Sequence, residues 1–468
     1  MKEGSRIPDP SYVHLLRPLR SLCLCGEFMR YNPRMNLRET LQAARVAARR
    51  LALLSGPERS ALLGDFAATL SEPAAKQAVF AANAADMALA REEEKAGRLG
   101  AALVKRLSLD EKKLATTVDG IGQLAAMPEL VGRTLTNRIL DHGLILKRQS
   151  VPLGVLGVVF EARPDALVQI TSLAWKSGNA VALKGGREAA QSNRALTAVA
   201  HAVLAKHGID ASAMVLLEDR AEVDSLLGMD DLVELVIARG SSQFIRHVRS
   251  HTRIPVMAHA DGICHAYLHA SAEPVMSAKV LVDSKCSYPA ACNAVETLLW
   301  DVDAGAALDA CVKALEESKV ELRGCAETRK RHPQMKPASE EDWATEYGDL
   351  VLSIRQVSGI DEALAHIARY GSRHTDTILT QDAEVAARFL SEVDSACVFH
   401  NASTRFSDGY RFGLGAEVGI STDKLHARGP VGVEGLLTYR WLLFGRGQCT
   451  LDYSSDGRHF IHKDLPVD

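Results

Sequence analysis

The sequence lacks any apolar run that approaches the roughly 20 residues needed to cross a bilayer. It also lacks an excess of charge of one sign, because 55 Lys and Arg residues stand against 58 Asp and Glu residues. Nothing therefore indicates a membrane protein, or a partner such as DNA, RNA or an anionic lipid surface. With 47% hydrophobic and 24% charged residues, the chain has the composition of an ordinary soluble globular protein.

The cysteines show neither the pattern of a disulfide framework nor that of a metal site. There are nine, scattered along the chain: Cys23, Cys25, Cys264, Cys286, Cys292, Cys311, Cys325, Cys397 and Cys449. An odd, scattered set favours reduced thiols, a reducing compartment and hence a cytoplasmic location. Cys23 and Cys25 form only a C-x-C with no second Cys/His pair at zinc-like spacing, so no metal is expected.

The N-terminus differs in composition from the rest of the chain. Residues 1–34 are rich in arginine and proline, and the apolar run around residues 22–24 is too short for a secretory core. Glu3 and Asp9 weaken an interpretation as a transit peptide. We expect residues 1–34 to be a disordered extension, or an over-long start upstream of Met35.

Between residues 155 and 256, strand patterns alternate with helix patterns. The expected strands are Val155–Phe160, Ala180–Lys184, Met214–Glu218 and Glu234–Ala238. The expected helices are Leu167–Lys176, Ala189–Lys206, Ala221–Leu227 and Gln243–Ser250. This alternation predicts a parallel, doubly wound α/β sheet that binds a ligand at the carboxyl ends of its strands.

The length of 468 residues is more than one core usually organises, so at least two domains are expected. Alanine-rich helices from Asn36 to about residue 126 precede the alternating region, and Arg138–Lys147 is typical of two short strands around a turn. The expected division is a first domain over 35–260, a second α/β domain over 261–435 and a C-terminal tail over 436–468. The tail either completes the first domain or pairs with a neighbouring subunit.

Two strand ends carry small residues and cations just before a helix. They are Lys184, Gly185, Gly186 and Arg187 after one strand, and Arg239, Gly240 and Ser241 after another. Glycines allow a ligand to approach the backbone closely, and helix N-termini favour anions. No G-x-G-x-x-G follows either strand, so a dinucleotide would be bound differently from the usual Rossmann fingerprint. The alternative is a pair of glycine turns with solvated charges.

Cys292 lies between a Pro-Ala-Ala turn and the apolar stretch 295–300, where a thiol can face a cleft. A free thiol has a pKa of about 8.5, so a nucleophilic cysteine needs help from a dipole or a cation. Lys285 lies nearby in the sequence. The alternative for Cys292 is an inert buried thiol, and we expect Cys264 and Cys286 to be bystanders.

A polar, glycine-rich segment follows the apolar stretch 396–399. Hydroxyls and a bidentate arginine in such a segment can hold a carboxylate or a phosphate, although a long structural loop is the alternative. The candidate ligands are Asn401, Ser403, Thr404, Arg405, Glu417, Lys424 and Arg428.

Together these segments resemble the γ-glutamyl phosphate reductase family, a branch of the aldehyde dehydrogenase superfamily, from about residue 36 to the low 440s. The most specific stretch, Val357–Ile378, matches the family signature at every fixed position. Further hallmarks are Phe160–Pro164, Ala291–Ala294 and the segment from Asn401 to Arg428. The resemblance implies an aldehyde dehydrogenase-like fold. Its parts would be a Rossmann-like cofactor domain, an α/β catalytic domain and a small β oligomerisation arm, formed by the 138–149 hairpin and the tail.

The resemblance implies NADPH-dependent reduction of L-glutamyl 5-phosphate to L-glutamate 5-semialdehyde with release of phosphate, the second step from glutamate to proline. Cys292 would form a thioester that hydride then reduces. Asn293 is an implied catalytic residue, and Arg163 is implied to serve the oxyanion or the leaving phosphate. The alternative is another acylating aldehyde dehydrogenase, acting on a CoA thioester or a different acyl phosphate. A non-catalytic scaffold is a weaker alternative.

Three positions separate the chain from other relatives. The Glu-Leu-Gly-Gly general base of hydrolytic relatives is missing, because residues 259–262 read His-Ala-Asp-Gly. Arg187 replaces the Glu of NAD-preferring relatives, which favours NADP(H), and Ser241 replaces a more usual glycine. Glu346 is implied to hold the nicotinamide ribose. The implied partners are further copies of the chain and, transiently, glutamate 5-kinase. Residues 1–34 are too few for the kinase domain of bifunctional relatives, so one activity is expected.

Overall fold

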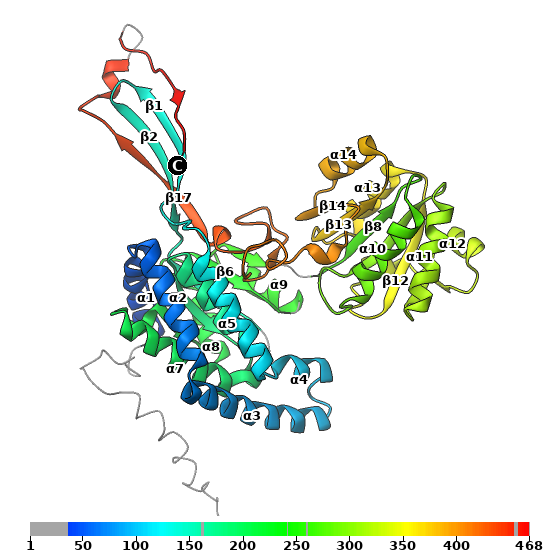
Figure 1. Ribbon diagram of the computed structural model, residues 1–468, viewed down its shortest axis with the longest axis horizontal. Coiled ribbons are helices and arrows are strands. Elements are labelled where there is room, and N and C mark those ends of the chain that lie inside the picture. The colour runs from blue at the N-terminus through cyan, green and yellow to red at the C-terminus, as the bar shows by residue number, and fades with distance from the viewer. Residues whose placement is uncertain (1–35, 161–162, 241, 259–260, 454–456, 468) are drawn as a thin grey trace, which may run out of the picture.

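The computed structural model describes residues 36–160, 163–240, 242–258, 261–453 and 457–467. The predictions for residues 1–34 and for Ser241 lie outside this described part. Two α/β bodies lie side by side, and a β arm projects from the first body, away from both (Figure 1).

Side-chain caps and buried apolar stripes define the helices that open the first body. The Asn36 side chain accepts the Glu39 N–H, and the Glu39 carboxylate accepts the Asn36 N–H, so α1 (Leu37–Ala52) begins with a capping box. Leu41, Ala44, Ala48 and Leu51, which recur at helical spacing, are buried. The next helices are α2 (Gly56–Ser71), α3 (Pro73–Lys95), α4 (Ala101–Leu107) and α5 (Glu111–Ala126). The predicted run of helices to residue 126 is confirmed.

The first body contains a five-stranded parallel sheet in the order β5-β4-β3-β6-β7. Its strands are β3 (Val155–Val159), β4 (Ala180–Lys184), β5 (Met214–Leu216), β6 (Leu235–Ala238) and β7 (Val256–Ala258). Its helices are α6 (Pro164–Lys176), α7 (Ala190–Lys206), α8 (Arg220–Leu227) and α9 (Ser242–His251). Each predicted strand and helix is confirmed, with ends that differ by a few residues. The chain runs from β3 through β4 to β5 on one side of the sheet, and then returns to form β6 and β7 on the other side of β3. The switch point of the sheet therefore lies between β3 and β6, where ligands bind in such folds.

The second body contains a seven-stranded parallel sheet in the order β11-β10-β12-β9-β8-β13-β14. Its strands are β8 (Cys264–Leu268), β9 (Val295–Asp301), β10 (Glu321–Gly324), β11 (Lys336–Pro337), β12 (Val351–Val357), β13 (Thr375–Leu379) and β14 (Cys397–His400). Its helices are α10 (Pro274–Cys286), α11 (Gly305–Glu317), α12 (Ala326–Arg331), α13 (Ile360–Tyr370) and α14 (Ala383–Glu392). The central strand β9 is buried along its whole length, including its polar residues Glu296, Thr297 and Asp301.

After β14 the chain returns to the first body. Strand β15 (Ile420–Ser421) pairs with β16 (Gly429–Pro430) and lies against β7 of the five-stranded sheet. Val418, Val431 and Leu436 are buried in the core that α2, α6 and β3 share. The polar segment that begins at Asn401 therefore bridges the two bodies.

The arm is a four-stranded antiparallel sheet in the order β17-β2-β1-β18. Its strands are β1 (Thr134–Asp141), β2 (Leu144–Pro152), β17 (Leu437–Phe444) and β18 (Lys463–Asp464). The hairpin is thus longer than the predicted 138–149, and Gly143 takes a φ of +74° at its turn. The C-terminal strands pair with the hairpin of the same chain.

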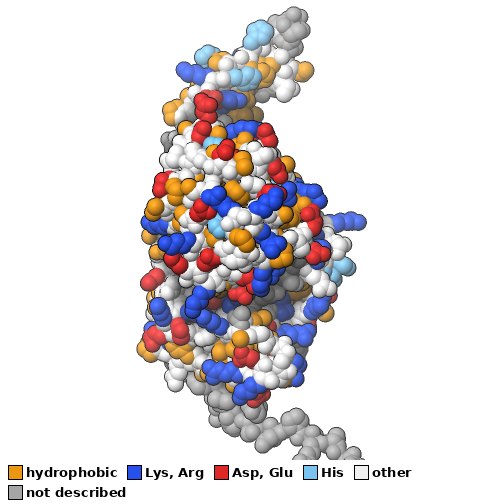
Figure 2. Space-filling view, turned by 90° about the vertical axis from the view of Figure 1, so that its right-hand side faces the viewer, with side chains coloured by type: hydrophobic (Ala, Val, Ile, Leu, Met, Phe, Trp, Pro, Cys, Tyr) orange, Lys and Arg blue, Asp and Glu red, His pale blue; other side chains and the backbone are white. Residues whose placement is uncertain are grey.

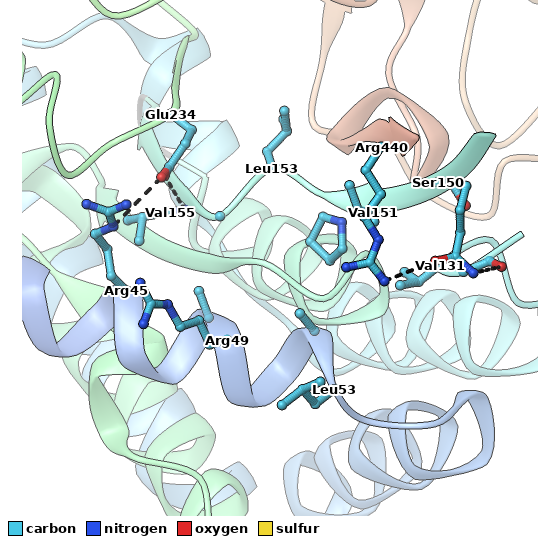
Figure 3. A pocket seen from close by; sticks show the side chains of 16 residues that line it. Arg45, Arg49, Leu53, Val131, Ser150, Val151, Leu153, Val155, Glu234 and Arg440 are labelled. Carbon is cyan, nitrogen blue, oxygen red and sulfur yellow. Dashed lines mark hydrogen bonds and ion pairs between the residues drawn. The ribbon is translucent and has the colours of Figure 1, made fainter. Parts of the chain in front are cut away.

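Charged side chains of both signs alternate over the face of the second body that Figure 2 shows, with no large patch of one sign. Among the described residues, no helix combines the length and apolarity that a membrane crossing requires. A cavity of about 360 Å³ lies at the root of the arm, between α1 and β2 (Figure 3). Its arginines are Arg45, Arg49 and Arg440, and it contains none of the predicted site residues.

Candidate active site

The Cys292 loop connects α10 to the buried strand β9, and the Cys292 side chain is partly exposed. The next residue, Asn293, is buried, and its Nδ2 donates a hydrogen bond to the Ser407 carbonyl oxygen at 2.7 Å. Asn293 therefore ties the loop to the polar segment between the two bodies. The Asn293 Oδ1 is buried with no hydrogen-bond partner among the described residues.

Three residues hold the backbone of Cys292 in place. A Cβ atom on Gly262 would lie 2.1 Å from the Cys292 carbonyl oxygen and 2.6 Å from its Cα, so only glycine fits there. The Glu346 Oε2 accepts the Gly262 N–H at 2.9 Å. The buried Cys264 thiol donates to the Cys292 carbonyl oxygen at 3.3 Å. Glu346, predicted to hold a ribose, thus lies beside the Cys292 loop, and Cys264 is packed as expected.

The charges around Cys292 oppose one another. The pKa of the Cys292 thiol is raised to about 12: burial is the largest cause, the carboxyl groups of Glu346 and Glu417 also raise it, and Arg239 and Arg405 lower it. Without ligands the thiol is therefore protonated at neutral pH. The two guanidinium groups are the features that favour a thiolate.

Lys285, which lies near Cys292 in the sequence, pairs with the carboxyl group of Glu296. Its Nζ lies 2.6 Å from the Glu296 Oε2, and both side chains are fully buried. Burial raises the pKa of Glu296 to about 7, an effect that Lys285 opposes. The Lys285 charge thus stabilises a buried carboxylate below the loop.

Arg163 and Arg239 come from the switch point of the first body. Arg163 directly precedes α6, and Arg239 and Gly240 directly follow β6. Burial lowers the pKa of Arg239, which the nearby Arg163 lowers further and Glu417 raises. Burial also raises the pKa of Glu417, whose Oε2 accepts the Gly409 N–H at 2.8 Å. The two arginines and this carboxyl group therefore form one cluster that reaches Cys292 electrostatically.

Ser403, Thr404 and Arg405 form the start of a short helical turn that faces α10. The Ser284 hydroxyl donates to the Ser403 hydroxyl at 3.1 Å, and Arg405 Nε donates to the Ser287 hydroxyl at 3.2 Å. The Thr404 hydroxyl oxygen is buried with no hydrogen-bond partner among the described residues. Arg405 is thereby positioned beside the nucleophile loop.

Three other predicted ligands are engaged elsewhere. The Asn401 side chain accepts the Thr380 N–H at 2.9 Å and donates to the Thr380 carbonyl oxygen at 2.8 Å. Lys424 and Arg428 both pair with Asp394, at 3.0 and 2.9 Å. The structure therefore separates Arg405 and Glu417, near Cys292, from Asn401, Lys424 and Arg428.

The predicted phosphate-binding residues line a second cavity, of about 330 Å³, beside the ends of β3 and β4. Lys184 and Arg187 lie in its wall, and Gly185 and Gly186 connect them. Arg220, at the first residue of α8, lies in the same wall and was not predicted. Its position after β5, at the carboxyl edge of the same sheet, was the signal that could have identified it.

Among the described residues, no cluster of three or more His, Cys, Asp and Glu side chains could hold a metal ion. The candidate chemical groups are the Cys292 thiol, the guanidinium groups of Arg163, Arg239 and Arg405 and the carboxyl groups of Glu346 and Glu417 near it, and the guanidinium groups of Arg187 and Arg220 in the second cavity.

The fold defines the class of protein. The structure superimposes on an acetylating aldehyde dehydrogenase from Geobacillus thermoglucosidasius with a TM-score of 0.61 at 15% identity, over 88% of this chain and 97% of that one. The chain therefore has the aldehyde dehydrogenase fold, with the arm, the two α/β bodies and the cysteine loop between them.

Closer relatives define the family. The γ-glutamyl phosphate reductase of Synechococcus sp. (strain JA-3-3Ab) is 52% identical over 427 residues, which are 91% of this chain and 93% of that protein. The crystal structure of the γ-glutamyl phosphate reductase of Thermotoga maritima matches with a TM-score of 0.85 at 35% identity, covering 89% of this chain and 100% of that one. The chain belongs to the γ-glutamyl phosphate reductase family. No family model matches it.

Proposed function

We propose that the protein reduces L-glutamyl 5-phosphate to L-glutamate 5-semialdehyde with NADPH, releasing phosphate, as the second step from glutamate to proline. Membership of the family supports the substrate and the pathway. The observation that carries the mechanism is the position of Cys292, a partly exposed thiol between two arginines at the junction of the two bodies.

In the proposed first step, the Cys292 Sγ attacks the γ-acyl carbon of the substrate. An S–C bond forms, the C–O bond to phosphate breaks, and the departing phosphate takes the thiol proton, leaving a thioester. The Cys292 N–H and the guanidinium of Arg163 or Arg239 are placed to stabilise the oxyanion. Arg405 is the best candidate for an anionic group of the substrate, because Lys424 and Arg428 are already paired with Asp394.

The cofactor cavity fits a phosphorylated dinucleotide. Three cations line it, Lys184, Arg187 and Arg220, against the single carboxylate of Asp224. The bound nicotinamide would supply the hydride that reduces the thioester to the aldehyde. Glu346, fixed by the Gly262 N–H beside Cys292, is placed to orient the ribose next to the thioester. A structural neighbour at 13% identity, an engineered glycolyl-CoA reductase, carries bound NADP+.

The arm supports a further part of the proposal, that the protein is a homo-oligomer. Tyr439 and Trp441 on the edge strand β17 are both about half exposed, at 51% and 52%, and the Arg148 guanidinium lies over both rings. Exposed aromatic groups on an edge strand are typical of a protein interface.

The reverse reaction tests the proposal. Purified protein is given glutamate 5-semialdehyde, phosphate and NADP+, and the absorbance of reduced nicotinamide is followed. We expect formation of NADPH that depends on phosphate. Equal formation without phosphate, or formation that requires CoA in place of phosphate, would contradict the assignment, and the second result would indicate another acylating aldehyde dehydrogenase.

A further inference from the structure

The cofactor cavity is built from three neighbouring elements that approach the same space. Its lining residues are Val159, Lys184, Arg187, Arg220, Val223, Asp224 and Phe244. Val159 and Lys184 end β3 and β4, whereas Arg220 begins α8 and Phe244 lies on α9. Cations therefore enter the cavity from two sides, the loop after β4 and the first turn of α8.

The acidic residues next to Arg220 in the sequence are committed to other partners. Glu218 pairs with Arg194 at 2.6 Å. Asp219 and Glu222 form a capping box at the start of α8, in which each carboxylate accepts a backbone N–H. These three carboxylates are therefore occupied by other partners, and the Arg220 guanidinium remains available to bind a ligand.

Within the described ranges, the side chains of Arg187 and Arg220 form no ion pair or hydrogen bond. Asp224, the one carboxylate in the cavity wall, lies 3.4 Å from the His247 ring. Lys184 and the two guanidinium groups face the one carboxylate of Asp224 in the cavity wall, so the mutual repulsion of the cations has a cost in the free protein. A bound dianion removes that cost.

We infer that Arg220 is a second cofactor-specificity residue, which binds the 2′-phosphate of NADP(H) from the α8 side while Arg187 binds it from the β4 side. This inference rests on the proposed function. A phosphate monoester carries close to two negative charges and three acceptor oxygens. One guanidinium can engage two of them in a bidentate pair, and a second cation is needed for the third. A 2′-hydroxyl offers no charge to either arginine.

The sequence assigned recognition of the 2′-phosphate to Arg187 alone, whereas this inference divides it between Arg187 and Arg220. Removal of Arg220 should weaken only ligands that carry the 2′-phosphate. A charge-assisted hydrogen bond lost in this way corresponds to roughly a tenfold to hundredfold loss of affinity. Ligands that lack the 2′-phosphate should bind as before.

Calorimetric titration of the full-length protein with adenosine 2′,5′-bisphosphate and with 5′-AMP tests this, because the two probes differ only in the 2′-phosphate. We expect Arg220→Gln to weaken the bisphosphate roughly tenfold to a hundredfold and to leave 5′-AMP unchanged, with Arg220→Lys in between. Arg246→Gln is the matched control, since Arg246 lies on α9 outside the cavity lining and loses the same charge.

The outcomes distinguish the inference from the proposed function. If the unmodified protein binds both probes equally, the NADPH preference itself is wrong. If it prefers the bisphosphate and Arg220→Gln keeps the whole preference, only the role of Arg220 is overturned. An equal loss for both probes also overturns it, because the substitution would then act on the structure of α8.

Discussion

The two cation-lined regions of the molecule differ in what balances their charge. In the cofactor cavity, Lys184, Arg187 and Arg220 face a single carboxylate, so the cavity attracts an anion. Around Cys292, two guanidinium groups are matched by the carboxyl groups of Glu346 and Glu417, and the thiol stays protonated. Under the proposed function, the first region would bind the cofactor, whereas the reactivity of Cys292 in the second would depend on the arrival of substrate and cofactor.

The strongest test of this contrast is the thiol itself. We expect Cys292→Ala to reduce turnover by roughly 10³-fold or more, because no other group would form the thioester. Cys286→Ala, at the end of α10, should keep most of the activity and serves as the control. Initial rates of NADPH formation measure both. Full activity in Cys292→Ala would move the nucleophile to another residue.

Gly262 tests how closely the reactive region is packed. In Gly262→Ala the new Cβ would meet the Cys292 carbonyl oxygen at 2.1 Å, so the loop must shift. A displacement of this kind costs roughly 100-fold in turnover, with little change in cofactor binding. Gly120→Ala in α5 is the control, since a Cβ there meets nothing within 4 Å. Retention of more than a tenth of the turnover in Gly262→Ala would show that the loop tolerates the shift.

Arg405 and Lys424 test which cations of the bridging segment bind substrate. Arg405→Gln should lower kcat/KM by roughly tenfold to a hundredfold, because it removes a charge-assisted contact next to the thiol. Lys424→Gln should change kcat/KM by less than about threefold, because Lys424 already pairs with Asp394 on the surface. Steady-state kinetics with varied semialdehyde measure both. The reverse ranking would place the substrate anion at Lys424.

The smallest expected effect concerns the pKa of the thiol. Glu346 and Glu417 raise the pKa of Cys292, so Glu346→Gln and Glu417→Gln should each lower it. Arg405 lowers this pKa, so Arg405→Gln should raise it. At a fixed pH below about 12, the thiolate fraction then rises in the two Glu variants and falls in the Arg variant.

The rate of alkylation by iodoacetamide, followed against pH in the absence of ligands, reports the thiolate. The label on the Cys292 peptide is followed by mass spectrometry, because Cys286 and Cys325 are also partly exposed and Cys449 is exposed. A profile that does not move in any of the three variants would mean that burial alone sets the pKa.

Much of the secondary structure could be predicted because it depends on neighbours in the sequence. Strand β4 was predicted to the residue, since its apolar run ends at Lys184 and is followed by two glycines. The start of α1 was readable from its capping residue and its apolar spacing. The bounds of the arm hairpin were less accurate, because its strands carry many polar residues and are only partly buried.

The candidate site was predictable in its residue types but not in its partners. Cys292, Arg405 and Glu346 were identified from motifs and from the family resemblance. That Lys285 pairs with Glu296, and that Lys424 and Arg428 pair with Asp394, depends on contacts between separate elements. No local pattern encodes such pairs, because the partner of a long charged side chain is the nearest opposite charge in space.

The sequence by itself determined the helices, the strands, the parallel order of the first sheet and the family, because these follow from periodicity, capping and motifs along the chain. Only the tertiary structure decided which cations remain available. Arg220 joins Arg187 in one cavity because α8 begins beside the end of β4, and Gly262 fits Cys292 because two loops approach within one atom's width. These distances are set by packing between elements that are far apart in the sequence, so no local sequence pattern predicts them.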